Sequence, residues 1–170
     1  MNVPPGNVSR FLSVTCRLTM LTGVLLFSTS ATADYKVSAY KDAPGYRQIM
    51  AADYASASQA TVRTGSVTSK FAVTSNRCVA EVQLGDLDAA LSSCNGALGE
   101  YKAYRTFSYL PGNRREEKAS LLSNRGVVLA LQGQMTAAEA DFIQALKFNP
   151  EHANAAENLE YVRSKQVGIR

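Results

Sequence analysis

The sequence predicts an all-α protein, a short α-solenoid of two to three antiparallel helical hairpins with a C-terminal capping helix. One observation is apolar spacing typical of a helix, because Ala138, Phe142 and Ala145 recur at intervals of three and four. Another is an internal repeat, in which Ser75-Asn76-Arg77 recurs 48 positions later as Ser123-Asn124-Arg125. Such repeats indicate stacked supersecondary units, because each unit buries its apolar face against the next.

The first 33 residues have the features of a secretory signal peptide. Two arginines precede an apolar run from Leu18 to Phe27, and no acidic residue occurs before Asp34. The small residues Ala31 and Ala33 suit a signal peptidase. We therefore expect cleavage after Ala33 and a periplasmic or secreted protein. An uncleaved anchor is the alternative, although the apolar run is shorter than the about 20 residues of a spanning helix.

The charge of the cleaved chain gives no reason to expect nucleic acid as a partner. The whole chain has 18 Lys and Arg against 14 Asp and Glu. Removal of the leader would take away Arg10 and Arg17, which leaves 16 basic residues against 14 acidic ones. A nearly neutral protein lacks the electrostatic attraction that favours binding to phosphate backbones.

Residues 34–70 are expected to form an N-terminal arm, a degenerate hairpin and a linker. Residues 34–45 show little periodicity, so we expect a loosely ordered arm. Residues 46–62 are predicted to be helical in two pieces, which form either a third, degenerate repeat or an Ala- and Ser-rich helix packed on the next hairpin. Residues 63–70 are polar and rich in Ser, Thr and Gly, as is typical of a linker.

Two clear hairpins follow. The first is predicted to have helices at 71–84 and 87–104, with Asp86 as the N-cap of the second helix. The second hairpin turns at Gly133, because glycine takes the left-handed conformation that ends many helices. Pro150 closes it, since proline cannot continue a helix.

The second hairpin resembles the tetratricopeptide repeat family. That pattern has Gly at place 8, a Tyr-like residue at 11, Ala at 20, an aromatic residue at 24, Ala at 27 and Pro at 32. Counted from Ala119, these places hold Gly126, Leu129, Ala138, Phe142, Ala145 and Pro150. Counted from Phe71, they hold Cys78, Glu81, Ala90, Cys94, Ala97 and Lys102. The resemblance covers residues 71–152 and implies a stack of helical hairpins.

The family's period of about 34 residues implies an insertion between the two copies. We place it at about 101–118, where aromatic residues precede the turn signal Pro111-Gly112. The aromatic residues Tyr101, Tyr104, Phe107 and Tyr109 either pack a lengthened helix pair or form a binding lip. A last helix with a polar outer face is expected to cap the domain at 71–165. The tail 166–170 is expected to fray.

The repeat frame implies a pairing of the two cysteines that follow the leader. Cys78 and Cys94 occupy places equidistant from the turn of the first hairpin, so they are expected to face each other. Disulfides persist outside the cytoplasm, so the expected export predicts a Cys78–Cys94 bridge. Two buried thiols are the alternative.

The resemblance also implies a concave groove lined by the first helix of each repeat. Asparagines stand at place 6 of this surface, and each can bond an extended peptide backbone with both its donor and its acceptor. Solvated polar residues are the alternative. Place 2 holds Ala72, Ser120 and Asn154, so the cations with which some family members bind a terminal carboxylate are missing. The candidate ligand-binding residues are Asn76, Val79, Gln83, Asn124, Val127 and Asn158. Arg125 is a candidate partner of Asp141.

The sequence contains no arrangement typical of a catalytic, metal or cofactor site. Its single histidine, His152, lies at the expected start of the last helix, where a helix-end role is favoured over that of a base. The expected function is therefore a non-enzymatic adaptor or scaffold of the cell envelope that binds a protein or peptide in its groove. The alternative is a structural or assembly protein that self-associates through its open helical edge and the aromatic insertion.

Overall fold

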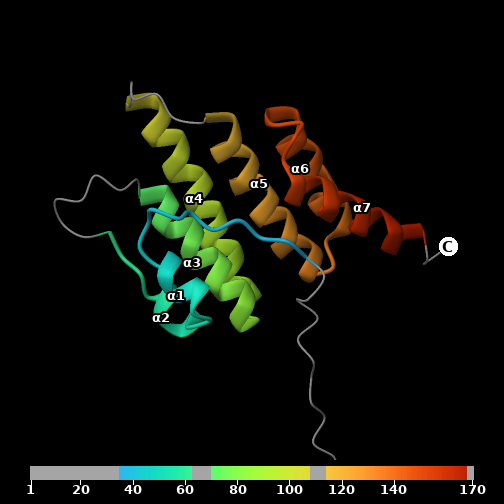
Figure 1. Cartoon of the computed structure of the whole chain (residues 1–170). Coiled ribbons are helices and arrows are strands. Elements are labelled where there is room, and N and C mark those ends of the chain that lie inside the picture. Colours follow the sequence, from blue (N-terminus) through green and yellow to red (C-terminus); the bar gives the residue numbers. More distant parts are fainter. Residues whose placement is uncertain (1–34, 63–69, 108–113, 168–170) are drawn as a thin grey trace, which may run out of the picture.

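The described part of the chain is built from helices. The structure, a computed structural model, describes residues 35–62, 70–107 and 114–167, and these ranges contain no strand. Helices adjacent in the sequence pack against each other (Figure 1), which confirms the expected all-α, solenoid-like fold. The helices are α1 (Tyr46–Met50), α2 (Tyr54–Ser58), α3 (Lys70–Leu84), α4 (Leu87–Phe107), α5 (Arg114–Leu131), α6 (Met135–Phe148) and α7 (Ala153–Val167).

Two antiparallel hairpins, α3–α4 and α5–α6, form the body of the protein. Each turn contains a glycine with positive φ, Gly85 at 77° and Gly133 at 78°. A side chain would be strained in that conformation, which explains why glycine stands at both turns. The Asp86 carboxylate accepts the N–H of Ala89 at 3.1 Å, and this bond confirms the predicted N-cap of α4.

The two helices of the second hairpin are in close contact at Gly126. A Cβ atom at this position would lie 2.7 Å from Cε1 of Phe142, which is closer than real Cβ contacts. Next to this contact, Arg125 donates to both carboxylate oxygens of Asp141 at 2.6 and 2.7 Å, as predicted. A small residue and a bidentate ion pair therefore set the separation of α5 and α6.

A disulfide joins the helices of the first hairpin. Cys78 on α3 and Cys94 on α4 have their sulfur atoms 2.12 Å apart, which confirms the predicted pairing. Both cysteines belong to the main hydrophobic core cluster, together with Val127 and Phe142 of the second hairpin. The first hairpin is thus cross-linked at the point where it packs against the second.

Helical residues make up most of the expected insertion. α4 extends to Phe107 and α5 begins at Arg114. The rings of Tyr101 and Tyr104 pack on Phe71, with centroids 5.1 and 5.4 Å apart, so these two aromatic residues pack the hairpin internally. The turn signal Pro111-Gly112, the leader and residues 63–69 of the expected linker lie outside the described residues.

The last helix, α7, closes the stack with a one-sided apolar surface. Leu159 and Val162 are buried, whereas Glu157, Glu160 and Arg163 are exposed. This pattern is the one expected of a capping helix. The helix continues to Val167, past the domain end that we placed at 165, so the first two residues of the expected frayed tail are helical.

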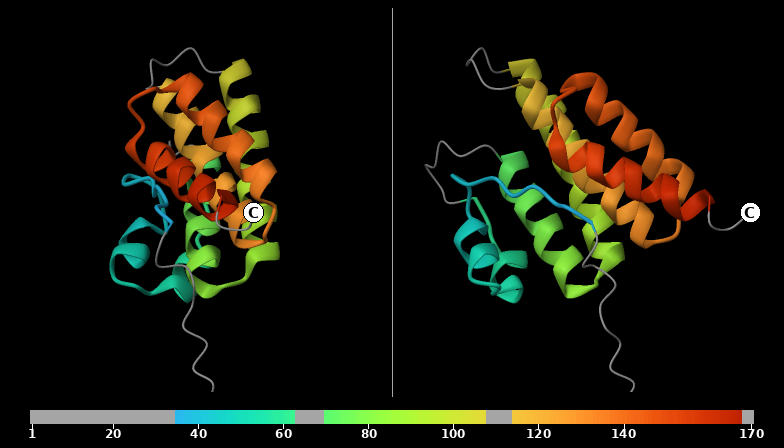
Figure 2. Two further views of the ribbon diagram at one scale, coloured as in Figure 1. Left: turned by 90° about the vertical axis from the view of Figure 1, so that its right-hand side faces the viewer. Right: turned by 45° about the vertical axis from the view of Figure 1, so that its right-hand side comes forward.

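The described N-terminal region, residues 35–62, packs along the helical stack. The two short helices α1 and α2 confirm the two predicted helical pieces, and both contact α3. Whether they form a third repeat stays a prediction. Residues 35–45, which precede α1, run across one face of the molecule from α7 to α3 (Figure 2).

Candidate peptide-binding face

Three asparagines lie on the first helices of the hairpins and on the capping helix. Asn76 is on α3, Asn124 on α5 and Asn158 on α7, and we call them the asparagine row. Each is at most 1% exposed, so its amide group needs hydrogen-bond partners within the protein. All three find such partners in one segment, residues 35–40, which we call the arm.

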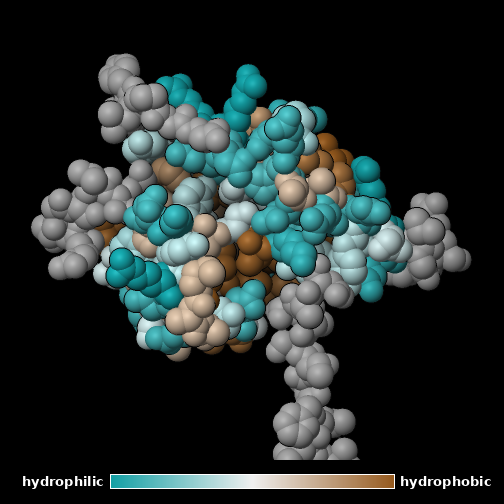
Figure 3. All heavy atoms as spheres, viewed as in Figure 1, coloured by the Kyte–Doolittle hydropathy of each residue, from teal (hydrophilic) through white to brown (hydrophobic). Residues whose placement is uncertain are grey.

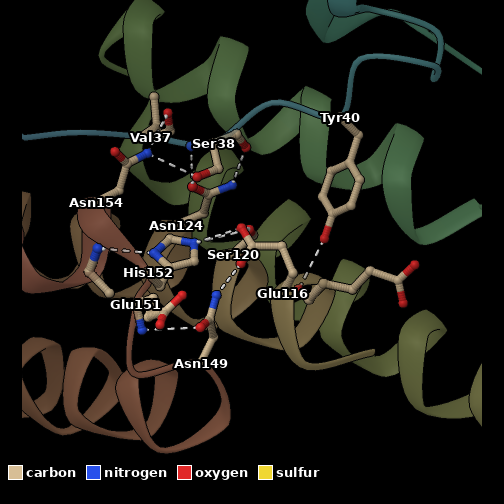
Figure 4. Close-up of polar contacts among 12 residues, drawn as sticks. Val37, Ser38, Tyr40, Glu116, Ser120, Asn124, Asn149, Glu151, His152 and Asn154 are labelled. Atoms are coloured by element: carbon tan, nitrogen blue, oxygen red, sulfur yellow. Dashed lines mark hydrogen bonds and ion pairs between the residues drawn. The ribbon is translucent and has the colours of Figure 1, made fainter. Parts of the chain in front are cut away.

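Each asparagine of the row binds both backbone groups of one arm residue. The N–H of Tyr40 donates to Oδ1 of Asn76 at 2.7 Å, and its carbonyl oxygen accepts from Nδ2 at 3.0 Å. Figure 4 shows the central pair, formed by Asn124 and Ser38. Both bonds of this central pair are 2.8 Å long. In the third pair, Lys36 with Asn158, the two bonds are 2.8 and 2.7 Å long.

The spacing of the bound residues shows that the arm is an extended chain. Residues 36, 38 and 40 are bound, and in an extended chain the backbone groups of alternate residues point toward the same edge. The asparagine row therefore takes the place of a neighbouring strand. The arm passes from α7 to α3, opposite to the order of these helices in the sequence.

Two tyrosines attach the ends of the arm. Tyr35 packs edge-on against Tyr161 of α7, with ring centroids 4.9 Å apart, and Tyr40 packs in the same way against Phe71 of α3 at 5.6 Å. The Tyr40 hydroxyl donates to the carbonyl oxygen of Glu117 at 3.0 Å. Burial, and to a lesser extent the Glu117 carboxylate, raise the pKa of Tyr40, so this hydroxyl stays a donor at neutral pH.

The middle of the arm makes both apolar and polar contacts. Val37 packs against the main core cluster. Asn154 of α7 donates to Oγ of Ser38 at 3.0 Å and to the Val37 carbonyl oxygen at 3.4 Å (Figure 4). The surrounding surface is largely hydrophilic, with an apolar area near its centre beside the arm (Figure 3).

The arm corrects one expectation from the sequence and excludes one of the alternatives. Residues 35–40 are not loosely ordered, because the asparagine row fixes their backbone. The asparagines are not solvated polar residues, since all three are buried. Of the other predicted groove residues, Val79 and Val127 are also buried, and Gln83 is partly exposed. The three asparagines bond an extended backbone, which is a segment of the same chain, and binding of a separate peptide stays a prediction.

The Ser120 and His152 pair lies beside the arm and is explained by helix capping. Nδ1 of His152 accepts the N–H of Ala155 at 3.1 Å, so His152 is the N-cap of α7, in agreement with its predicted helix-end role. The proton of the neutral ring is then on Nε2, which lies 3.1 Å from Oγ of Ser120 and 3.6 Å from Glu116 (Figure 4). In this tautomer the ring cannot accept a proton from Ser120.

Within the residues that the structure describes, no group of three or more His, Cys, Asp or Glu side chains could hold a metal ion. Over the same ranges, no helix is both long enough and apolar enough to cross a membrane. Comparisons with family models, with curated proteins and with solved structures found no match. The function of the face is therefore inferred from its own geometry.

The arm was not predicted from the sequence as the segment that the asparagine row binds. A signal was present, because Tyr35, Val37 and Ala39 alternate with Lys36 and Ser38 as in a half-buried strand. The partner of this strand is a set of side chains between 36 and 122 positions away, so no second strand pattern accompanies it.

Proposed function

We propose that this protein is a non-enzymatic adaptor that binds extended peptide segments of partner proteins on its asparagine row. The observation that supports this function is the bonding of three buried amides to both backbone groups of three alternate arm residues. These bonds use the backbone alone, so they suit an extended segment of another protein equally well. Peptides that pair through their backbone in this way gain affinity from hydrogen bonds and specificity from alternate side chains.

Two further observations support the class and the location that we propose. The stacked hairpins, with Gly126 against Phe142, agree with a divergent tetratricopeptide repeat. The Cys78–Cys94 disulfide supports an oxidising compartment and thus an exported protein, cleaved after Ala33. We therefore propose a periplasmic or secreted adaptor.

Selection of displayed random octapeptides on the immobilised protein tests the peptide-binding function. We expect selected peptides to bind the Asn76→Ala/Asn124→Ala variant at least about tenfold more weakly, because each lost hydrogen bond is worth roughly 1 kcal/mol. The matched control is Asn95→Ala, since Asn95 is exposed on α4 and lies outside the row. Circular dichroism checks that both variants are folded. Failure to select any peptide, or equal binding by the double variant, would refute the proposal.

A further inference from the structure

We infer that the arm is a tethered competitor that occupies the peptide-binding face, and that a partner segment binds by displacing it. This inference rests on the proposed function and adds how the face is regulated and which segments it accepts. Its basis is that the arm uses the donor and the acceptor of every asparagine in the row. A second extended segment cannot form the same bonds while the arm is bound.

The short connection of the arm to the body favours the closed state. Only residues 41–45 separate the arm from α1. Nδ2 of Asn76 also bonds the Pro44 carbonyl oxygen at 3.1 Å, which holds this connection against α3. A tether of this length gives an effective concentration of the order of millimolar or more. The apparent affinity of a partner is reduced in proportion to the fraction of molecules whose face is open.

The arm can leave the face without opening the helical core. None of residues 35–40 is fully buried, and Lys36 is exposed. By contrast, the buried members of the main core cluster, such as Val127 and Phe142, all lie on helices. Release of the arm therefore exposes the asparagine row and the packing partners of Tyr35 and Val37, and leaves the disulfide-linked hairpin in place.

The arm also defines the class of segment that the face accepts. A competing segment needs a backbone N–H at three alternate positions, so proline is excluded at each of them. It needs aromatic residues five positions apart, to replace Tyr35 against Tyr161 and Tyr40 against Phe71. It needs no free carboxyl terminus, because the chain continues beyond Tyr40. The partner is thus a protein with an exposed extended segment of the form aromatic-x-β-branched-small-small-aromatic.

A labelled peptide with the sequence of residues 35–41, Tyr-Lys-Val-Ser-Ala-Tyr-Lys, tests the inference by fluorescence anisotropy. The Ser38→Pro variant loses the N–H that donates to Asn124, which weakens the arm and leaves the face unchanged. We expect this variant to bind the peptide at least about tenfold more tightly than the wild type, as expected when the closed fraction falls. The control Asp42→Ala changes an exposed residue next to the arm and is expected to bind like the wild type.

A second variant and a second measurement keep the inference testable if the Ser38→Pro variant does not fold. Tyr35→Ala removes one aromatic contact and keeps the backbone, so it should also bind the peptide more tightly than the wild type. Hydrogen exchange provides the direct readout, because added peptide should speed exchange of the Ser38 N–H in the wild type. If the wild type and both arm variants bind the peptide with equal affinity, the arm is not a competitor, and the proposed function still stands.

Two other outcomes have different meanings. If no variant binds the peptide, the face does not accept a segment from outside, and the proposed function fails together with the inference. If sedimentation finds wild-type dimers that exchange their arms, the arm acts between two copies, and the competitor within one chain is overturned.

Discussion

An asparagine amide carries one acceptor oxygen and one donor nitrogen, which are the groups that a residue of a neighbouring strand would present. This pair explains how Asn124 satisfies both the N–H and the carbonyl of Ser38. Aspartate could accept the N–H but could not donate to the carbonyl. The unpaired group would then cost about 1–3 kcal/mol. The asparagines of the row are therefore matched to a peptide backbone residue by residue.

Glu81 is a residue that departs from the repeat pattern. It stands at place 11 of the first copy, where the second copy has Leu129. Only 6% of it is exposed, and one of its carboxylate oxygens has no hydrogen-bond partner among the described residues. The nearest charged group of Arg77, also on α3, is Nη2, which lies 4.0 Å from Oε1 of Glu81. Burial is the main cause that raises the pKa of Glu81 above its ordinary value.

The Glu81→Gln variant should be more stable than the wild type at neutral pH. Because the folded state holds the Glu81 proton more tightly, wild-type stability falls as pH rises from the ordinary glutamate pKa through the raised one. The advantage of glutamine should therefore be full above the raised pKa and vanish in acid below the ordinary pKa. Urea unfolding over a pH series measures it, with Glu160→Gln on the exposed side of α7 as control. A difference that does not change with pH would contradict this account.

The hairpins show how a small residue sets the geometry of an element. Gly126 permits α5 to approach Phe142 of α6, and no glycine-specific backbone angle is involved because Gly126 lies inside the helix. Gly99 lies inside α4 in the same way, but a Cβ there would meet nothing within 4 Å. The two glycines thus separate the effect of packing from the effect of helix propensity.

Alanine at these two positions should change stability in opposite directions. Gly126→Ala forces the Phe142 ring to move and should lower the free energy of unfolding by about 1–3 kcal/mol. Gly99→Ala should raise it by roughly 0.5–1 kcal/mol, because alanine loses less conformational entropy in a helix. Urea denaturation of both variants measures the difference. A stabilised Gly126→Ala variant would show that α5 and α6 are not in close contact there.

The disulfide stabilises the first hairpin as an element. Cys78 and Cys94 are 16 positions apart, and a loop of this size corresponds to about 3 kcal/mol in the chain-entropy description. The Cys78→Ala/Cys94→Ala variant should be destabilised by that order of magnitude, and a reductant should destabilise the wild type but not the variant. Peptide mapping by mass spectrometry should find the linked pair in the untreated protein. Alkylation of both cysteines without reduction would contradict the bridge.

The arm connects the whole stack, because one short segment bonds to α3, α5 and α7. The arm therefore links the two hairpins and the capping helix, in addition to the contacts that these helices make with one another. Displacement of α7 would remove Asn158 from the row and leave the Lys36 backbone groups without their partners. The capping helix and the arm are expected to be coupled in stability for this reason.

Val162→Asp on α7 tests this coupling. Val162 is fully buried, and an unpaired carboxylate there should destabilise the protein by roughly 3 kcal/mol or more. The Lys36 N–H, bonded to Asn158, should then exchange faster with solvent, as measured by hydrogen exchange. The control Ala156→Asp adds the same charge at an exposed position near the start of α7, where a small effect is expected. Protection of the Lys36 N–H that persists in Val162→Asp would show that arm and cap are independent.

Local signals and the repeat were enough to predict most of the fold. Turn glycines such as Gly133, the N-cap Asp86 and the helical spacing of apolar residues act over a few positions, so they are readable from one chain. The repeat then aligned the helices of each hairpin, which placed Cys78 opposite Cys94 and Arg125 opposite Asp141. It also put the three asparagines on one face.

The segment that covers that face, the arm, could not be predicted in the same way. The bonds between the arm and the asparagine row join residues 36 to 122 positions apart, and their energy depends on three helices already being stacked. The burial of Glu81 has the same origin, since its surroundings come from packing and not from its neighbours in the sequence. Short-range propensity and periodicity thus fix the helices and their pairing in this protein, whereas long-range packing alone brings its N-terminal segment onto the face it covers.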